Sequence, residues 1–218
     1  MRIVICDDHR LLLESLSAAL AQRGITVEAA VLGPADAVRA VILHDPDVLL
    51  IDLAFPEGSG LRAAREVLAR HPRTKVVVLT GSTSSEALVE ALDVGVAGFL
   101  RKDQDVPEIA AALEAVAGGG SAVDPMLLKQ ASRPTVSLPR QRRPDVQLTA
   151  RERSVAALLV DGRNTDEIMR ALGVSQSTVR THVQSILTKL GVHTRLQAVT
   201  VLARQLPPPP GAHDALRG

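Results

Sequence analysis

The stretch VLLIDLAFPEGSG (residues 48–60) joins an apolar run to a loop rich in proline and glycine. Its first four residues are apolar, with β-branched residues at both ends, a pattern typical of a strand buried on both faces of a sheet. Because the loop follows at once, Asp52 lies at the carboxyl end of a central strand. In open parallel sheets ligands bind at this edge, so Asp52 is the first candidate for a functional residue.

The sequence around this stretch alternates between strand and helix patterns. The predicted strands cover residues 2–6, 25–31, 47–52, 75–80 and 97–100, and the predicted helices cover residues 9–23, 34–44, 61–70, 85–94 and 106–117. Such alternation predicts a doubly wound, five-stranded parallel sheet, which is a flavodoxin-like α/β fold.

Polar residues mark the carboxyl ends of these strands: Asp7, Asp8, Asp52, Thr80 and Lys102. Three carboxylates at one edge repel one another unless a cation joins them, and oxygen ligands from loops suit Mg²⁺. A hydroxyl and an ammonium are the groups that would stabilise a phosphoryl group on Asp52. The pattern therefore favours Mg²⁺-dependent phosphoryl chemistry, and acids that merely cap loops are the alternative.

This N-terminal part resembles the receiver domain of two-component response regulators over residues 1–118. The resemblance rests on residues at matching spacing: Asp7, Asp8, Asp52, Pro56, Gly60, Thr80 and the segment 98–102. It implies the following roles: Asp52 as phosphoacceptor; Asp7, Asp8, Asp52 and the Ala54 carbonyl as Mg²⁺ ligands; Thr80 and Lys102 as phosphoryl contacts; Thr80 and Phe99 as switch residues. The sequence departs from the family at Phe55, where Met is usual, and at Gly81, where Ala is usual.

Charge is distributed unevenly along the chain. Residues 1–120 carry 11 Lys and Arg against 17 Asp and Glu, whereas residues 121–218 carry 14 against 7. A basic C-terminal half indicates a polyanionic partner. The single cysteine, Cys6, excludes a disulfide framework, and no signal peptide or long apolar run is present, so we expect a cytoplasmic protein without a membrane partner.

Proline and arginine interrupt the sequence between the two halves. Residues 121–147 are predicted to form a linker, with a short helix from Asp124 to Gln130. Residues 207–218 begin with a run of prolines and are predicted to be a disordered tail. The expected domains are thus residues 1–120 and 148–206.

The second domain is predicted to be a small all-α helix-turn-helix unit. Thr149 and Glu152 form a capping box that opens its first helix, and the last helix is capped by Thr194. Helices over residues 166–172 and 176–190 flank Gly173, which permits the tight turn between them.

Residues 147–205 resemble the LuxR-type DNA-binding domain, and its union with a receiver is the arrangement of the NarL/FixJ class. The motif includes the capping box, Gly162, Glu167-Ile168, the segment 175–183, Ile186, Lys189-Leu190-Gly191 and Arg195. The resemblance implies base contacts from Arg180, Thr181 and Gln184 and phosphate contacts from Thr178, His182 and Lys189; Ser177 shares the outer face of the helix. Departures at Asn164-Thr165, Met169 and Gln184 affect the preferred DNA sequence. A helix-packing role for His182 stays open.

Leu196, Val199 and Leu202 recur at helical spacing on the last helix. A small helix-turn-helix domain gains affinity by pairing on two half-sites, so these residues are candidates for a homodimer contact, with core packing as the alternative.

The sequence as a whole predicts a non-enzymatic transcriptional regulator. The resemblance implies that a sensor histidine kinase phosphorylates Asp52, and we expect phosphorylation to promote dimerisation and binding to double-stranded DNA. One alternative is a phosphorylation-independent regulator whose receiver senses a ligand or partner. Another is an aspartyl-phosphate phosphatase, which is disfavoured because position 54 is Ala rather than a second Asp.

Overall fold

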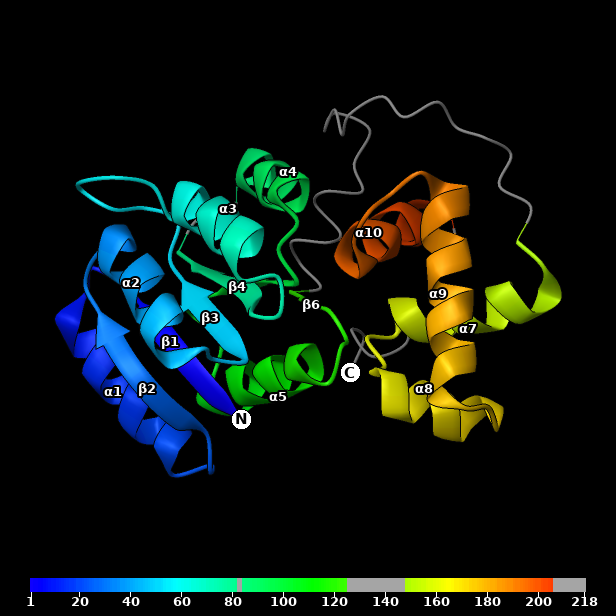
Figure 1. The fold of residues 1–218 in the computed structure, drawn as a ribbon, viewed down its shortest axis with the longest axis horizontal. Coiled ribbons are helices and arrows are strands. Elements are labelled where there is room, and N and C mark those ends of the chain that lie inside the picture. The colour runs from blue at the N-terminus through cyan, green and yellow to red at the C-terminus, as the bar shows by residue number, and fades with distance from the viewer. Residues whose placement is uncertain (82–83, 125–147, 206–218) are drawn as a thin grey trace, which may run out of the picture.

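The computed structural model describes residues 1–81, 84–124 and 148–205. The N-terminal domain is a parallel sheet between two layers of helices, and the C-terminal domain is a helical bundle (Figure 1). The predicted short helix up to Gln130, the rest of the linker from residue 125 and the tail lie outside the described residues.

The N-terminal domain contains β1 (Arg2–Cys6), α1 (Arg10–Ala21), β2 (Thr26–Val31), α2 (Pro34–His44), β3 (Val48–Ile51), α3 (Gly60–Arg70), β4 (Lys75–Thr80), α4 (Ser85–Val94), β5 (Gly98–Arg101), α5 (Val106–Ala117) and β6 (Ala122–Val123). The sheet order is β2-β1-β3-β4-β5-β6, and every neighbouring pair is parallel. The predicted doubly wound parallel sheet is therefore confirmed.

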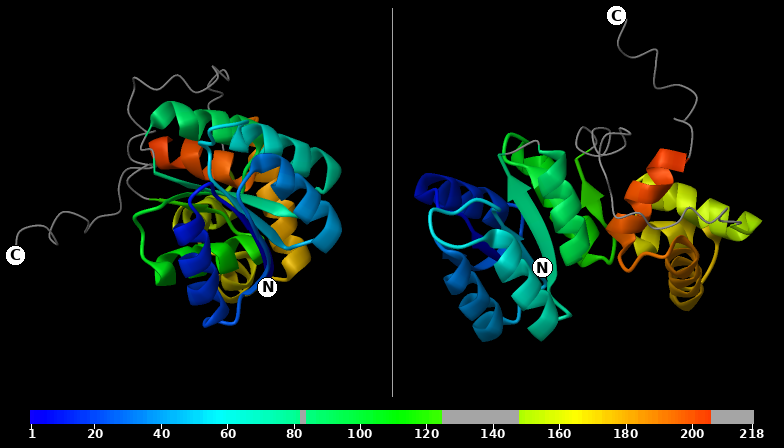
Figure 2. Two further views of the ribbon diagram at one scale, coloured as in Figure 1. Left: turned by 90° about the vertical axis from the view of Figure 1, so that its left-hand side faces the viewer. Right: turned by 90° about the horizontal axis from the view of Figure 1, so that it is seen from above.

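Alternate residues of each central strand face opposite layers of helices. Leu49 and Ile51 of β3 pack in an apolar core with α2, α3 and α4. Val48 and Leu50 pack in a second core with α1 and α5. Burial on both faces explains why this strand reads as a continuous apolar run, and Figure 2 shows the two helical layers.

The sixth strand is a difference from the prediction of five strands. Residues 122 and 123, which were assigned to the linker, extend the sheet beyond β5: Ala122 N donates to Ala97 O at 3.2 Å, and Asp124 N donates to Phe99 O at 3.0 Å. A strand of two residues has no detectable periodicity, and the preceding glycines resemble the end of a domain.

The C-terminal domain consists of α7 (Ala150–Val160), α8 (Thr165–Leu172), α9 (Gln176–Leu190) and α10 (Arg195–Gln205). The capping box of Thr149 and Glu152 is present, and Gly173 takes a left-handed conformation between α8 and α9. The predicted helix-turn-helix is thus formed. Within the part of the chain that is described, no helix is both long and apolar enough to cross a membrane.

Candidate functional site: a carboxylate pocket and the outer face of α9

The carboxyl edge of the sheet brings Asp7, Asp52 and Lys102 together. Asp7 follows β1 and Asp52 follows β3, and they are only 2% and 4% exposed. The Lys102 ammonium, which follows β5, lies 2.6 Å from Asp7 Oδ2 and 2.7 Å from Asp52 Oδ2. Burial opposes the charge on this ammonium, but its hydrogen bond to Asp52 and its ion pair with Asp7 outweigh burial and raise the pKa of Lys102. One cation therefore holds two buried carboxylates at the predicted site.

Asp8 adds a third carboxylate to this edge of the sheet, next to Asp7. His9 Nδ1 lies 3.1 Å from Asp7 Oδ1 and 2.8 Å from Asp8 Oδ1, but only the approach to Asp7 has hydrogen-bond geometry. Asp8 Oδ1 is thus buried without a hydrogen-bond donor among the described residues. An acceptor oxygen of this kind, next to the carboxylate of Asp7, fits a hard divalent cation such as Mg²⁺.

The loop after β3 folds back over Asp52. Asp52 Oδ1 accepts a hydrogen bond of 2.6 Å from Leu53 N, and Gly60 N donates to Leu53 O at 3.2 Å. A Cβ atom at Gly60 would clash with the Asp52 carbonyl oxygen, so only glycine fits this position. Ala54, whose carbonyl is a predicted Mg²⁺ ligand, is exposed in the same loop.

The predicted switch residues lie on the two strands next to the pocket. Thr80, at the end of β4, is buried, and its carbonyl accepts a 2.9 Å hydrogen bond from Lys102 N. Phe99 on β5 is fully buried in the apolar core that also contains Leu88 and Leu92 of α4. Phe99 of β5 and the buried face of α4 thus share one apolar core.

The outer face of α9 presents the predicted base-reading residues. Arg180, Thr181 and Gln184 are exposed, together with Ser177, whereas Val179 and its neighbours on the inner face are buried. The three predicted phosphate contacts are half-buried: Thr178, His182 and Lys189. Thr178 also takes part in the helix cap, because its backbone N–H donates to Ser175 Oγ at 3.2 Å.

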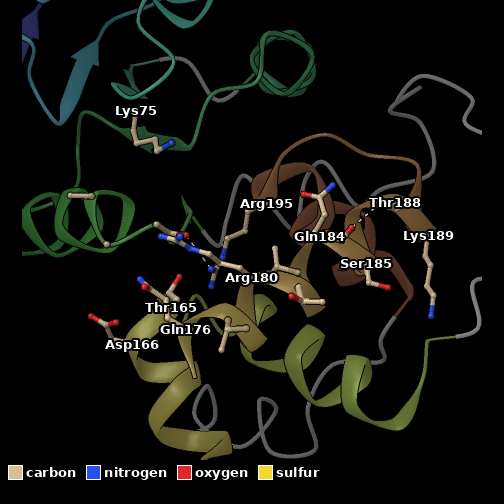
Figure 3. A pocket seen from close by; sticks show the side chains of 16 residues that line it. Lys75, Thr165, Asp166, Gln176, Arg180, Gln184, Ser185, Thr188, Lys189 and Arg195 are labelled. Atoms are coloured by element: carbon tan, nitrogen blue, oxygen red, sulfur yellow. Dashed lines mark hydrogen bonds between the residues drawn. The ribbon is translucent and has the colours of Figure 1, made fainter. Parts of the chain in front are cut away.

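The same face of α9 is turned toward the receiver. A cavity of about 1190 Å³ is lined by Arg180, Thr181 and Gln184 on one side and by Lys75 and Gly119 of the N-terminal domain on the other (Figure 3). In this arrangement the N-terminal domain borders the space in front of the outer face of α9.

Two sets of contacts hold the domains in this arrangement. At the first, Gln197 Nε2 of α10 donates to Leu92 O of α4 at 2.8 Å, and Leu196, 1% exposed, packs in the apolar core of the N-terminal domain. At the second, Arg195 Nη1 donates to Gly119 O at 3.1 Å, just beyond the end of α5. Burial lowers the pKa of Arg195 to about 10.

Sequence reasoning missed this interface. Leu196 has the same helical spacing as Val199 and Leu202, which are buried within their own domain, and nothing in that spacing distinguishes a core residue from an interdomain one. The three predicted dimer residues are therefore all covered in this structure.

Both domains of the chain match known protein families. The family model of the response regulator receiver domain matches residues 3–114, and that of bacterial regulatory proteins of the luxR family matches residues 146–202. The chain is 34% identical to the transcriptional regulatory protein DegU of Brevibacillus brevis, with 91% of each chain covered. It is 35% identical to the probable transcriptional regulatory protein NarL of Mycobacterium tuberculosis (strain H37Rv), with 94% of each chain covered.

Solved structures have the same fold. RcsB, a response regulator of Salmonella typhimurium, is 22% identical, covers 93% of this chain and 98% of its own, and has a TM-score of 0.57. The receiver domain of the putative response regulator NarL of Mycobacterium tuberculosis is 33% identical, covers 54% of this chain and 96% of its own, and has a TM-score of 0.52. With its receiver domain and its LuxR-type helix-turn-helix domain, the chain belongs to the family of two-component response regulators that act as DNA-binding transcriptional regulators.

Proposed function

We propose that a sensor histidine kinase phosphorylates this regulator on Asp52, and that phosphorylation frees the C-terminal domain to dimerise on double-stranded DNA. The observation that carries the proposal is the Lys102 ammonium held between the buried carboxylates of Asp7 and Asp52. This arrangement neutralises negative charge where the phosphoryl group would add more. A kinase partner and a DNA target both agree with a cytoplasmic location.

Asp7, Asp8, Asp52 and the Ala54 carbonyl would hold Mg²⁺. When bound, the ion supplies positive charge to the phosphoryl oxygens. Asp52 provides the attacking carboxylate oxygen, and the bond between phosphorus and the kinase histidine breaks as the new O–P bond forms. Lys102, released from one carboxylate, then pairs with a phosphoryl oxygen, and Thr80 supplies a hydroxyl to another.

The switch would reach the DNA-binding domain through α4. Thr80 lies just before the segment that leads to α4, and Phe99 packs in the same core as Leu88 and Leu92 of that helix. A shift of α4 would weaken the contacts of Leu92 with Gln197 and of the core with Leu196. Release of α10 would uncover Leu196 for a dimer contact and would also open the outer face of α9.

The test is incubation with a small phosphodonor and Mg²⁺, followed by a search for an acid-stable, base-labile phosphate. Wild-type protein should be labelled, and Asp52→Asn should fold but lack the label, because the amide is not a nucleophile. Asp47→Asn, at the opposite end of β3, is the matched control and should be labelled normally. Equal labelling of Asp52→Asn would refute the assignment. DNA binding without any labelling of the wild type would favour a receiver that senses a ligand or partner.

A further inference from the structure

Glu152 is a buried carboxylate that links α7 to the DNA-reading helix α9. Only 4% of the residue is exposed, and it lies in the first turn of α7. Its oxygens accept three short hydrogen bonds: Thr149 N at 2.7 Å, Ser185 Oγ at 2.7 Å and Lys189 Nζ at 2.6 Å. Two of these three donors lie on α9.

Ser185 and Lys189 are one helical turn apart, so they present their donors to Glu152 from the same side of α9. Ser185 directly follows Gln184, which is on the exposed face toward DNA. Because α9 is fixed at these two points, its rotation about its own axis is fixed as well. That rotation decides which side chains face the DNA.

The charge of Lys189 is used inside the protein. Its side chain is 35% exposed, and its ammonium is paired with a carboxylate that is itself almost fully buried. To neutralise a DNA phosphate, the Lys189 ammonium would have to leave Glu152 or contact Glu152 and the phosphate at the same time. Removing Lys189 from Glu152 would leave a buried charge without its ion pair, which is costly.

We propose that Glu152 is a positioning residue for DNA recognition: it orients α9 through Ser185 and Lys189, and it keeps Lys189 as an internal partner rather than a phosphate ligand. The inference rests on the proposed binding of DNA, in which α9, the second helix of the helix-turn-helix, would place its outer face in the major groove. It replaces the phosphate contact expected for Lys189 with a role inside the domain.

The first arm of the test compares two serine substitutions in the full-length protein. The probes are a duplex that the wild type selects from a random pool and a scrambled duplex of equal length. Ser185→Ala should lose about fivefold in affinity for the selected duplex, the lower end of one lost base contact, and little for the scrambled one. Ser154→Ala, an exposed serine on α7, is the matched control and should change neither. If Ser185→Ala left both affinities unchanged, or lowered both by the same factor, the positioning role would be overturned.

The second arm measures how DNA binding depends on salt. If Lys189 is neutralised internally, the pair variant Glu152→Gln with Lys189→Met should keep the wild-type slope of log K against log salt. A phosphate contact would instead reduce the slope by about 0.9. Lys189→Met alone should have a lower Tm than the pair variant, because it leaves Glu152 buried and unpaired. A reduced slope, or a pair variant no more stable than Lys189→Met, would refute the internal role.

Arg180→Ala separates this inference from the placement of α9. If Arg180→Ala loses the same factor on both duplexes, α9 does not read bases through that arginine, and the major-groove placement fails. If Arg180→Ala loses selectivity while the pair variant loses slope, the placement stands and only the role of Glu152 and Lys189 fails.

Discussion

The carboxylate pocket and the outer face of α9 use their cations in opposite ways. In the pocket, Lys102 is held by two buried carboxylates of its own domain. On α9, Arg180 is exposed and lines a cavity together with another cation, Lys75 of the receiver. The pocket is therefore assembled within one domain, whereas the outer face of α9 borders a cavity shared with the other domain. Under the proposed function, this face binds DNA only after the two domains separate.

Gly60→Ala should disrupt the carboxylate pocket and leave the outer face of α9 intact. The new Cβ would force the loop away from Asp52, so we expect a loss of labelling and a destabilisation of about 1–3 kcal/mol. Labelling and thermal unfolding measure the two effects. Gly81→Ala is the control: its Cβ would meet no atom of the described residues within 4 Å, and it should stabilise the chain by about 0.4–1 kcal/mol. Normal labelling of Gly60→Ala would contradict the packed loop.

Lys102→Ala should uncouple phosphorylation of the carboxylate pocket from DNA binding by α9. Asp52 keeps its nucleophilic oxygen, so some labelling persists, but the ammonium that joins the phosphoryl group to β5 is lost. We expect the labelled variant to bind DNA no better than the unlabelled one, as measured by titration of a fluorescent duplex. If labelling raised the DNA affinity of Lys102→Ala as much as that of the wild type, the signal would not pass through Lys102.

Gln197→Glu should expose the outer face of α9 without phosphorylation of the protein. Gln197 Oε1 caps α10 by accepting from His193 N and Thr194 N, and a glutamate keeps that role. The substitution replaces the donor to Leu92 O with an acceptor, so the α4–α10 contact is repelled. Loss of this hydrogen bond should raise the DNA affinity of unphosphorylated protein by roughly 2- to 10-fold. An unchanged affinity would mean that the contact does not restrain the domain.

Acid should affect the DNA-binding domain through Glu152. Hydrogen bonds from Lys189 and then Ser185 and Thr149 lower the pKa of Glu152 from 4.5 to about 2. Because the pKa of Glu152 is lower in the folded protein than in the unfolded chain, its carboxylate stabilises the fold at pH values above 4.5. This stabilisation is lost as the pH falls from 4.5 toward 2. Wild-type protein should therefore lose more unfolding free energy over this range than Glu152→Gln, as followed by urea denaturation. Parallel curves would show that Glu152 is not held as an anion.

The candidate site of the receiver could be predicted from the sequence because its residues lie at the ends of strands. Asp7, Asp52 and Lys102 follow three parallel strands, and a parallel sheet brings such ends to one edge. The helix caps at Thr149 and Ser175 were likewise local signals. The contact of Gln197 with Leu92 and the pairing of Glu152 with Lys189 join residues far apart in sequence, and their side chains have equally good local roles as caps and surface charges. Only the packing of the domains and helices reveals such pairs.

The most direct test of the account is the affinity for the selected duplex with and without phosphodonor and Mg²⁺, measured for wild type and Asp52→Asn side by side. The account predicts that phosphodonor and Mg²⁺ tighten DNA binding of the wild type and leave Asp52→Asn unchanged. Wild-type protein that is fully labelled on Asp52 and yet binds the duplex no more tightly would contradict it.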